Sequence, residues 1–338
     1  MPEVTVIGPT SWGITLGVIM AQKGLPVSLW CRSESEALAL NSPRESRQRL
    51  PGIPFPQTFT VTSDLPEAMD GSRLVLLAVP SQRMRENAKR IAPYVKHEML
   101  VMSASKGLEL GTALRMSQVL CQELGQEHAS RCCVLSGPNL AREVAQGLPS
   151  ATVVAANALS VAEAARELVM TPRFRVYCSD DIIGVEFGGT LKNIIALGAG
   201  MSDGWGYGAN AKAAFMTRGL TEIIRLGVVN GAHPLTFMGL AGIGDLMATC
   251  TSPLSRNRRV GEELARGRSL EEITATLGGV AEGITTTVAA LDLARASGVE
   301  MPIAEQTFKV LYEGMDARRA IAELMAREPT YELHGIDH

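Results

Sequence analysis

The chain of 338 residues is long enough for about two domains of ordinary size, and hydrophobic residues at 46% supply material for two cores. Its 32 lysines and arginines against 35 acidic residues give a net charge of −3, which excludes a general attraction to nucleic acid or acidic membranes. No apolar run approaches a membrane span, and no basic flank or cleavage site follows Met1. We therefore expect a cytoplasmic protein without membrane insertion whose partner is a small molecule.

The cysteines show no C-x-x-C pair, and most of them lie in or beside apolar, strand-like runs where buried thiols are common. They are Cys31, Cys121, Cys132, Cys133, Cys178 and Cys250. We expect reduced core residues rather than disulfides, and no metal site.

The first residues predict the opening of a dinucleotide-binding fold. Val4–Gly8 is an apolar run that ends in glycine, residues 11–24 have helical apolar spacing, and Val27–Cys31 is a second strand. In such folds, glycines let backbone N–H groups approach a pyrophosphate at a helix N-terminus. The fingerprint is imperfect, because Gly8 and Gly13 occupy two of the three glycine positions and Thr10 occupies the third.

Further strands alternate with helical stretches as far as residue 180. The expected strands are Leu74–Val79, Met99–Met102, Cys133–Leu135, Ala151–Ala155 and Phe174–Cys178, and Ser160 with Glu163 predicts a capping box on one helix between them. This order predicts an α/β, Rossmann-type, doubly wound parallel sheet over residues 1–180. Such sheets bind ligands at the carboxyl ends of their strands, where Arg32, Pro80, Lys106 and Gly137 fall.

After residue 180 the β-branched runs disappear, and residues 181–338 predict an all-α second domain. The expected helices are 181–200, 211–226, 262–266, 270–276, 285–297, 303–312 and 317–325, with a capping box formed by Ser269 and Glu272. We expect the tail 332–338 to be frayed.

Lys192 lies in the first helix of this domain in unusual company. Its helical neighbours are glycine, alanine, valine and isoleucine, and none is acidic. Such an ammonium either extends to solvent or lies in a cleft where desolvation lowers its pKa and suits it to proton transfer. Gly188 and Gly189 thin the helix where a ligand could approach.

Two further groups of residues each admit two interpretations. Arg32 follows the second strand, where an arginine indicates the 2′-phosphate of NADP, but Glu34 and Glu36 follow closely, so a plain loop arginine stays open. Asp245 is either a helix N-cap or a site residue. The run from Ser255 to Arg259 combines a capping serine with three arginines at a helix start, which indicates an anionic ligand or, alternatively, a nucleic-acid patch that lacks aromatic residues.

Several segments together resemble the bacterial NAD(P)-dependent glycerol-3-phosphate dehydrogenases, in order from about residue 4 to 320. They are VTVIG-x-x-SWG, LLAVPSQ, SASKGLE, LSGPNLAREVA, GVEFGGTLKNIIALGAGMSDG, GANAKAAFMTRGL, FMGLAGIGDLMATCTSPLSRNRRVG, VAEGITTT and GVEMPI. The resemblance implies reversible reduction of dihydroxyacetone phosphate to sn-glycerol 3-phosphate, the backbone precursor of phospholipids. It also implies a homodimer.

The resemblance implies roles for individual residues. Lys192 matches the proton donor to the ketone oxygen, which accepts the proton in the reverse direction. Matching substrate-contacting positions are Lys106, Gly137, Asn139, Asp245, Ser255, Arg256 and Asn257. Matching cofactor-contacting positions, with the glycines of the first turn, are Gly8, Ser11, Trp12, Gly13, Arg32, Arg49, Lys106, Ala141, Arg256, Val280 and Glu282.

Three positions depart from the family's usual residues: Thr10 replaces glycine, Asn139 stands where serine or threonine is common, and Arg49 stands where tyrosine is frequent. We expect NADPH as the preferred cofactor with NADH possible. Two other functions stay open at this point: a two-domain dehydrogenase of the 3-hydroxyacid or 6-phosphogluconate type, and a non-catalytic dinucleotide-binding sensor.

Overall fold

The computed structural model describes residues 1–329 and 331–332, and the chain forms two compact units. The first contains Met1–Ser105 and Met116–Ile182, and the second contains Lys106–Arg115 together with the chain from Ile183 onward. The segment Lys106–Arg115 therefore belongs to the second unit although the chain on both sides of it belongs to the first. Of the tail expected to fray, residues 333–338 lie outside the described residues.

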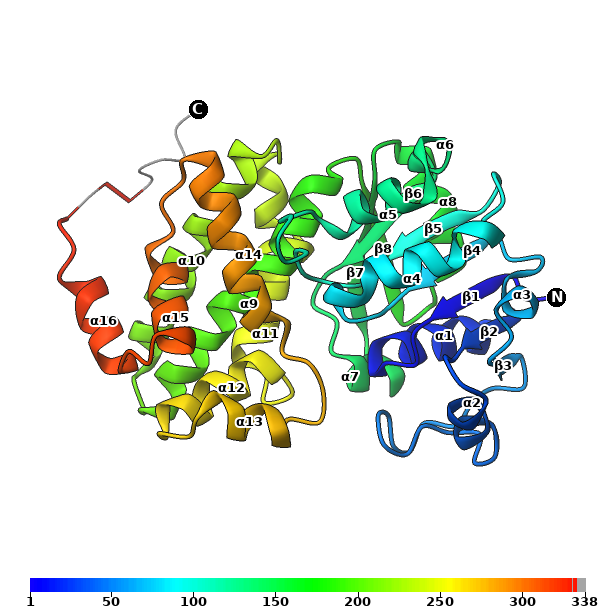
Figure 1. Ribbon diagram of the computed structural model, residues 1–338, viewed down its shortest axis with the longest axis horizontal. Coiled ribbons are helices and arrows are strands. Elements are labelled where there is room, and N and C mark those ends of the chain that lie inside the picture. Colours follow the sequence, from blue (N-terminus) through cyan, green and yellow to red (C-terminus); the bar gives the residue numbers. More distant parts are fainter. Residues whose placement is uncertain (330, 333–338) are drawn as a thin grey trace. The chain divides into compact units, whose positions relative to one another are not determined.

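The first unit is built on one eight-stranded sheet in the order β3-β2-β1-β4-β5-β6-β7-β8 (Figure 1). Its strands are β1 (Val4–Ile7), β2 (Val27–Trp30), β3 (Phe59–Thr62), β4 (Leu74–Leu77), β5 (Leu100–Ser103), β6 (Cys132–Ser136), β7 (Ser150–Ala156) and β8 (Phe174–Ser179). The Rossmann-type, doubly wound architecture is confirmed.

Two details of this sheet differ from the sequence-based expectation. β6 and β7 pair antiparallel, with Cys133 opposite Ala156, so the expectation of an all-parallel sheet is wrong at this pair. The chain between them turns back through one short helix instead of crossing a face of the sheet, and a returning strand runs antiparallel. β3 was not predicted, because only Phe59 and Val61 are apolar in this four-residue edge strand.

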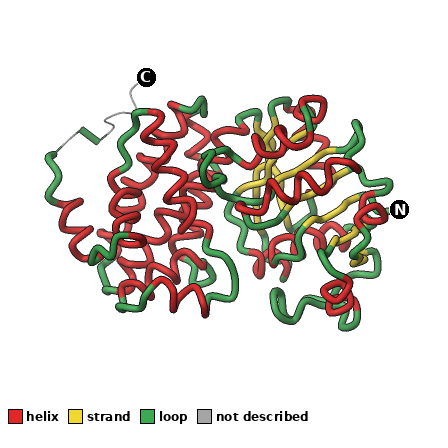
Figure 2. The backbone as a smooth tube through the Cα atoms, viewed as in Figure 1, coloured by secondary structure: helices red, strands yellow, loops and turns green. Residues whose placement is uncertain are grey.

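Helices cover both faces of the sheet (Figures 1 and 2). They are α1 (Ser11–Gln22), α2 (Glu34–Asn41), α3 (Leu65–Met69), α4 (Met84–Ile91), α5 (Met116–Leu124), α6 (Gln126–Ala129), α7 (Ala141–Ala145) and α8 (Leu159–Val169). Helix α1 connects β1 to β2 on one side of β1, and α4 connects β4 to β5 on the other side. Because β-α-β crossovers are right-handed, α1 and α4 lie on opposite faces, and α1 packs with α7 and α8 while α4 packs with α5.

The core of the first unit explains why its strands read as continuous apolar runs. All four residues of β4 are buried, as are all four of β1, because helices cover both faces of these central strands. Full burial of each such side chain stabilises the fold by about 1.5–3 kcal/mol. All six cysteines are free, and three of them, Cys31, Cys132 and Cys133, are buried in this unit.

The two predicted capping boxes have different outcomes. Ser269 caps its helix, accepting from the Glu272 N–H while the Glu272 carboxylate accepts from the Ser269 N–H, so this capping box is confirmed. The box predicted at Ser160 and Glu163 is wrong, because α8 begins at Leu159 with Ala158 in the cap position. Ser160 therefore lies inside the helix.

From Ile183 onward, the described residues of the second unit form helices joined by loops (Figure 2). Its α-helices are α9 (Ile182–Gly204), α10 (Ala209–Val229), α11 (Asp245–Thr251), α12 (Arg256–Ala265), α13 (Leu270–Thr276), α14 (Glu282–Ser297), α15 (Pro302–Tyr312) and α16 (Ala317–Met325). A 3-10 turn (Pro234–Met238) and a π-helical turn (Leu240–Gly244) precede α11. The predicted all-α domain is confirmed; α11 was not predicted, and the helix expected at 262–266 begins at Arg256.

Helix α9 is the buried centre of this unit. Among the described residues it is the one helix long and apolar enough to cross a membrane, with a mean hydropathy of 1.3, but 83% of that apolar window is buried inside the protein. The expectation that Gly188 makes room for a ligand is wrong. A Cβ on Gly188 would lie 2.5 Å from the Ala241 carbonyl oxygen, so this glycine lets the π-helical turn pack on α9.

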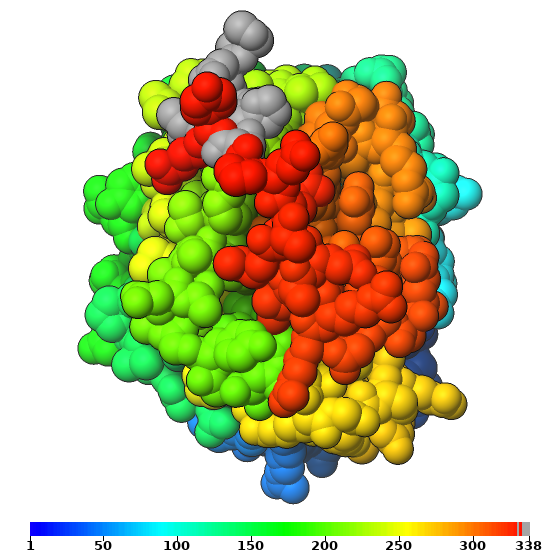
Figure 3. Space-filling view, turned by 90° about the vertical axis from the view of Figure 1, so that its left-hand side faces the viewer, coloured from blue at the N-terminus to red at the C-terminus, as the bar shows by residue number. Residues whose placement is uncertain are grey.

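A buried carboxylate joins α10 to α15. The outer surface of α15 and α16 is seen in orange and red in Figure 3. Glu222 is 3% exposed, and its two oxygens accept the N–H groups of Ile303 (2.7 Å) and Ala304 (3.3 Å) at the N-terminus of α15. Burial raises the pKa of Glu222 to about 8, although the two N–H donors oppose the shift.

We expect this carboxyl to make stability fall with pH. Below pH ~4.5 Glu222 is protonated in the folded and unfolded states alike, whereas between ~4.5 and about 8 only the unfolded state releases the proton. Wild type should therefore lose up to about 1.4 kcal/mol per pH unit relative to Glu222→Gln across this window.

The test is urea unfolding of both proteins at pH 5, 6, 7 and 8, with the exposed Glu313→Gln on the end of α15 as control. The informative quantity is how the difference in unfolding free energy between wild type and Glu222→Gln changes with pH. Its value at any one pH is less informative, because the glutamine amide also lacks one of the two hydrogen-bond acceptors of the carboxylate. Parallel stability curves for wild type and Glu222→Gln would show that Glu222 titrates normally.

Candidate active site

A buried carboxylate between two ammonium groups forms the centre of the second unit's polar cluster. Asp245 is 1% exposed, its Oδ2 accepts from Lys106 Nζ at 2.5 Å, and its Oδ1 accepts from Lys192 Nζ. The interpretation of Asp245 as an N-cap is wrong, because Gly244 holds the cap position of α11 and no side chain caps this helix. Two candidates that are far apart in sequence, Lys106 and Lys192, thus share one acid.

Lys192 is the more deeply buried of the two lysines, with a side chain that is 6% exposed against 19% for Lys106. Burial lowers the pKa of Lys192 to about 8; the Asp245 carboxylate raises it, and the Lys106 ammonium lowers it further. Its Nζ also donates to Thr249 Oγ1, one turn along α11 from Asp245. An ammonium with a pKa near neutrality, held by two oxygens, is equipped to transfer a proton.

The position of Lys106 depends on the segment Lys106–Arg115, which is fastened to α9. The Gly107 N–H donates to Thr190 Oγ1 at 3.1 Å, and Arg115 forms an ion pair with Glu186. Leu108, fully buried, packs in the core of the second unit. Thr190, Glu186 and Thr249 were not predicted from the sequence. The one signal that could have pointed to them is spacing: Thr190 and Glu186 lie two and six residues before Lys192, and Thr249 lies four residues after Asp245.

The start of α12 combines an ordered amide with an arginine that is not hydrogen-bonded within the described part of the chain. Asn257 donates to Asn193 Oδ1 and accepts from the Gly283 N–H, both at 2.9 Å, so it ties α12 to α9 and α14. Arg256 makes no hydrogen bond or ion pair with a described residue. Its guanidinium lies against Gly279, where an added Cβ would come within 2.4 Å of Nη1. Desolvation lowers the pKa of Arg256, against the effect of Glu282.

The other residues of the arginine run have different surroundings. Ser255 caps α12 by accepting the Arg258 N–H at 3.2 Å, as the sequence predicted. Arg258 pairs with Asp203 at 2.6 Å and with Glu262 at 3.3 Å, so it holds α12 to α9 and is not available to an anion. The interpretation of all three arginines as ligand groups is therefore wrong for Arg258.

In the first unit, the turn between β1 and α1 has the features of a phosphate cradle. Gly8 has φ +107°, and an added Cβ would lie 2.7 Å from Val79 Cγ1. Ser11 and Trp12 precede the first backbone hydrogen bond of α1, so their N–H groups have no intrahelical acceptor, and no acidic residue lies in this first turn. These features fit the pyrophosphate of a dinucleotide.

Thr10, the departure from the glycine fingerprint, is the N-cap of α1. Its hydroxyl accepts the Gly13 N–H at 3.0 Å and donates to the Ala78 carbonyl at 2.7 Å. The side chain is therefore directed to the end of β4.

The remaining candidates of the first unit surround the same edge of the sheet. Arg32 is exposed and makes no hydrogen bond or ion pair with a described residue, whereas Arg49 donates to the Pro9 carbonyl and to Glu36. Asn139, after Gly137, donates to the Ala151 carbonyl at 3.1 Å and accepts from Thr152 at 2.8 Å, so it holds its own turn to β7.

Three further candidates lie at helix starts. Ala141 begins α7 and its carbonyl accepts from Thr15 of α1 at 3.1 Å. In the second unit, Val280 is 45% exposed and Glu282 begins α14. Val280, two residues before α14, is therefore accessible, while Ala141 and Glu282 are the first residues of their helices; none of the three belongs to a hydrophobic core.

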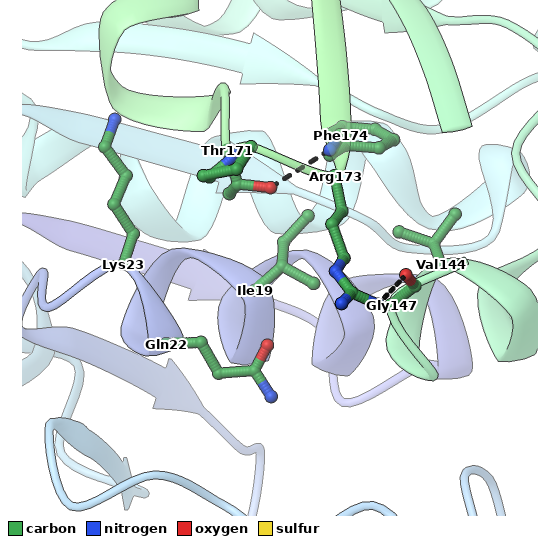
Figure 4. A pocket seen from close by; sticks show the side chains of 9 residues that line it. Ile19, Gln22, Lys23, Val144, Gly147, Thr171, Arg173 and Phe174 are labelled. Atoms are coloured by element: carbon green, nitrogen blue, oxygen red, sulfur yellow. Dashed lines mark hydrogen bonds between the residues drawn. The ribbon is translucent and has the colours of Figure 1, made fainter. Parts of the chain in front are cut away.

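A separate pocket of about 230 Å3 lies beside the C-terminal half of α1 (Figure 4). Its rim carries Lys23, which donates to the Glu167 carbonyl, and Arg173, which donates to the Gly147 carbonyl at 3.1 Å. None of the residues predicted from the sequence to form a site lines it.

Comparisons with known proteins show which family both parts of the chain resemble. Residues 3–162 match the family described as NAD-dependent glycerol-3-phosphate dehydrogenase N-terminus, and residues 181–322 match NAD-dependent glycerol-3-phosphate dehydrogenase C-terminus. The glycerol-3-phosphate dehydrogenase (NAD(P)+) of Dehalococcoides mccartyi is 53% identical over 336 residues, which cover 99% of this chain and 94% of that one. The enzyme of the same name from Moorella thermoacetica is 48% identical over 99% of both chains.

The crystal structure of glycerol-3-phosphate dehydrogenase from Coxiella burnetii superposes with a TM-score of 0.91 at 38% identity, covering 96% of this chain and 99% of that one. These matches cover both units, so the whole two-unit architecture is shared with these proteins. The chain belongs to the family of NAD-dependent glycerol-3-phosphate dehydrogenases.

Proposed function

We propose that this protein catalyses the reversible, NAD(P)H-dependent reduction of dihydroxyacetone phosphate to sn-glycerol 3-phosphate, with Lys192 as proton donor and, in reverse, acceptor. The observation that carries the role of Lys192 is its buried ammonium, held by Asp245 and Thr249, with a pKa lowered to about 8. The product is the backbone precursor of glycerophospholipids.

The proton chemistry follows from the cluster. The nicotinamide, when bound, supplies the hydride. Addition of hydride to the ketone carbon leaves an alkoxide, which Lys192 stabilises with its charge and then protonates. Asp245 keeps Lys192 charged and oriented, while Lys106 balances the second oxygen of the same carboxylate. General acid catalysis of this kind contributes about 10²–10⁴-fold to the rate.

The substrate phosphate requires a positively charged site, and we assign it to the start of α12. Arg256 has no partner among the described residues, and its guanidinium can grip a phosphate with two hydrogen bonds. Ser255 and Asn257 flank it at the helix start, where free N–H groups attract anions. We assign Lys106, Gly137, Asn139 and Asp245 to the rest of the substrate site on family resemblance.

The cofactor assignment uses residues of both units. Gly8, Ser11, Trp12 and Gly13 would hold the pyrophosphate. We infer a preference for NADPH over NADH from Arg32, which is exposed at the carboxyl end of β2 and makes no hydrogen bond or ion pair within the described part of the chain. Arg49, Lys106, Ala141, Arg256, Val280 and Glu282 complete the assignment by resemblance.

The organisation of the protein completes the proposal. We assign residues 1–180 as the dinucleotide-binding domain and residues 181–338 as the main substrate-binding and catalytic domain, and each also supplies some of the residues assigned above to the other ligand. A homodimer is part of the proposal on resemblance alone, and the cytoplasmic location expected from the sequence is proposed with it.

Loss of the Lys192 ammonium should abolish most of the turnover without unfolding the protein. Lys192→Met keeps the apolar stem, and Lys106 still compensates Asp245, so the variant should fold. We expect kcat for reduction of dihydroxyacetone phosphate to fall by on the order of 10²-fold or more. The exposed Lys89→Met on α4 serves as control, and a near-native kcat for Lys192→Met removes this lysine from the mechanism.

The pH dependence should be opposite in the two directions. Protonated Lys192 donates during reduction, so kcat for reduction should fall as pH rises through about 8, and kcat for oxidation should rise over the same range. Asp245→Asn removes the charge that raises this pKa and should move the inflection to lower pH; Lys106→Met removes a like charge and should move it higher. Inflections that stay in place in both variants would assign the titration to another group.

Removal of the Arg256 guanidinium, which has no hydrogen-bond or ion-pair partner among the described residues, should weaken substrate binding. We expect Arg256→Gln to raise KM for dihydroxyacetone phosphate by about 10- to 100-fold, because a charged hydrogen bond to phosphate contributes about 1.5–3 kcal/mol. Arg259→Gln, three residues along the same helix, is the matched control, since Arg259 is exposed and has no partner among the described residues. Equal KM values for the two variants would place the phosphate elsewhere.

A further inference from the structure

Arg49 is attached to the phosphate-binding turn of the first unit by its side chain and its backbone. Its guanidinium donates to the Pro9 carbonyl, and its own carbonyl accepts from Ser11 Oγ at 2.9 Å. Pro9 and Ser11 flank Thr10, the N-cap of α1. Arg49 is thus placed beside the N–H groups that fit a pyrophosphate.

The same guanidinium forms an ion pair with Glu36. Arg49 Nη1 lies 3.2 Å from Glu36 Oε1, and the two side chains are 38% and 24% exposed. Both line a pocket of about 550 Å3 between α2 and the segment that follows it. The pair is therefore accessible to a ligand and is not locked in the core.

This pair lies at the carboxyl end of β2. The buried thiol of Cys31, the residue after this strand, has a pKa raised mainly by burial, and Glu36 raises it further while Arg49 lowers it. Both charges therefore act at the position next to Arg32. In dinucleotide-binding folds the adenosine ribose is recognised here, an acid serving its 2′-hydroxyl and an arginine its 2′-phosphate.

We propose that Glu36 is a specificity-determining residue, which limits the preference for NADPH over NADH by holding the guanidinium of Arg49. This inference rests on the proposed cofactor use. Glu36 is paired with the Arg49 cation through Nη1, and a 2′-phosphate would draw on the same cation, so the phosphate and the carboxylate compete for one positive charge. NADH has a hydroxyl at this position and does not compete. Glu36 therefore weakens binding of NADPH and leaves binding of NADH almost unchanged.

The size of the effect follows from the exposure of the pair. Solvent screens partly exposed ion pairs, so their individual contributions are small. We expect Glu36→Gln to tighten NADPH by about 3- to 5-fold while Kd for NADH changes by less than about twofold.

A purely structural role for Glu36 predicts a different result. If the ion pair only keeps Arg49 fastened to the turn, its loss should loosen the turn and weaken both cofactors by the same factor. The ratio of the two dissociation constants, which such loosening does not move, is therefore the decisive readout.

The experiment measures Kd for NADPH and NADH by fluorescence titration of the full chain. Four variants are compared with wild type: Glu36→Gln, Arg49→Gln, the double variant, and Glu34→Gln. Glu34 lies in the same first turn of α2, is exposed, and has no partner among the described residues, so it controls for removal of one negative charge.

The proposal expects a higher preference for NADPH in Glu36→Gln, no change in Glu34→Gln, and no further effect of Glu36→Gln once Arg49 is glutamine. An unchanged ratio in Glu36→Gln, or the same increase in Glu34→Gln or in the Arg49→Gln background, overturns it. Because binding is measured, a wild type that binds both cofactors without turnover counts against the proposed reaction and not against Glu36. A wild type that binds neither overturns both.

Discussion

The organisation of the second unit depends on the burial of one carboxylate. Asp245 is almost inaccessible to water, and an isolated charge there would be too costly to keep. Two ammonium groups compensate it, and each must come from a separate part of the chain: Lys192 from α9, and Lys106 from a segment whose neighbours in sequence belong to the first unit. The cluster therefore requires that this segment, α9 and α11 stay together, which links the chemistry to the integrity of the fold.

This constraint also determines which lysine is suited to proton transfer. Both lysines contact the same carboxylate, but only Lys192 is fully enclosed, and burial disfavours its charged form. The repulsion from Lys106 acts in the same direction. One acid and two bases thus produce one cation that titrates near pH 8 and one that remains partly solvated, so the two lysines differ through their surroundings and not through their chemistry.

The sequence predicted those parts of the protein in which the local pattern and the tertiary structure agree. Central strands such as β4 are apolar throughout because both faces are buried, and long helices such as α9 keep their period. β3 and α11 are short, and the direction of β7 depends on where the returning chain pairs. Lys192 could be selected from its apolar neighbours, but its contacts with Asp245 and Thr249 could not, because both lie more than fifty residues away and only packing brings them together. Likewise, the local pattern of the arginine run does not separate Arg256 from Arg258; Asp203, on another helix, makes the difference.

The replacement of a fingerprint glycine shows why such motifs are better understood through their mechanics. The middle glycine normally lets a pyrophosphate come close to the backbone, which requires open space on one side of the turn. Thr10 meets this requirement differently, since its hydroxyl bonds to the Ala78 carbonyl and caps the Gly13 N–H on the side of β4. One donor of α1 is consumed, but those of Ser11 and Trp12 remain. A capped turn that Arg49 also fastens loses less conformational freedom when a ligand binds than a flexible glycine turn does. The side chain that departs from the motif thus contributes rigidity to the same site.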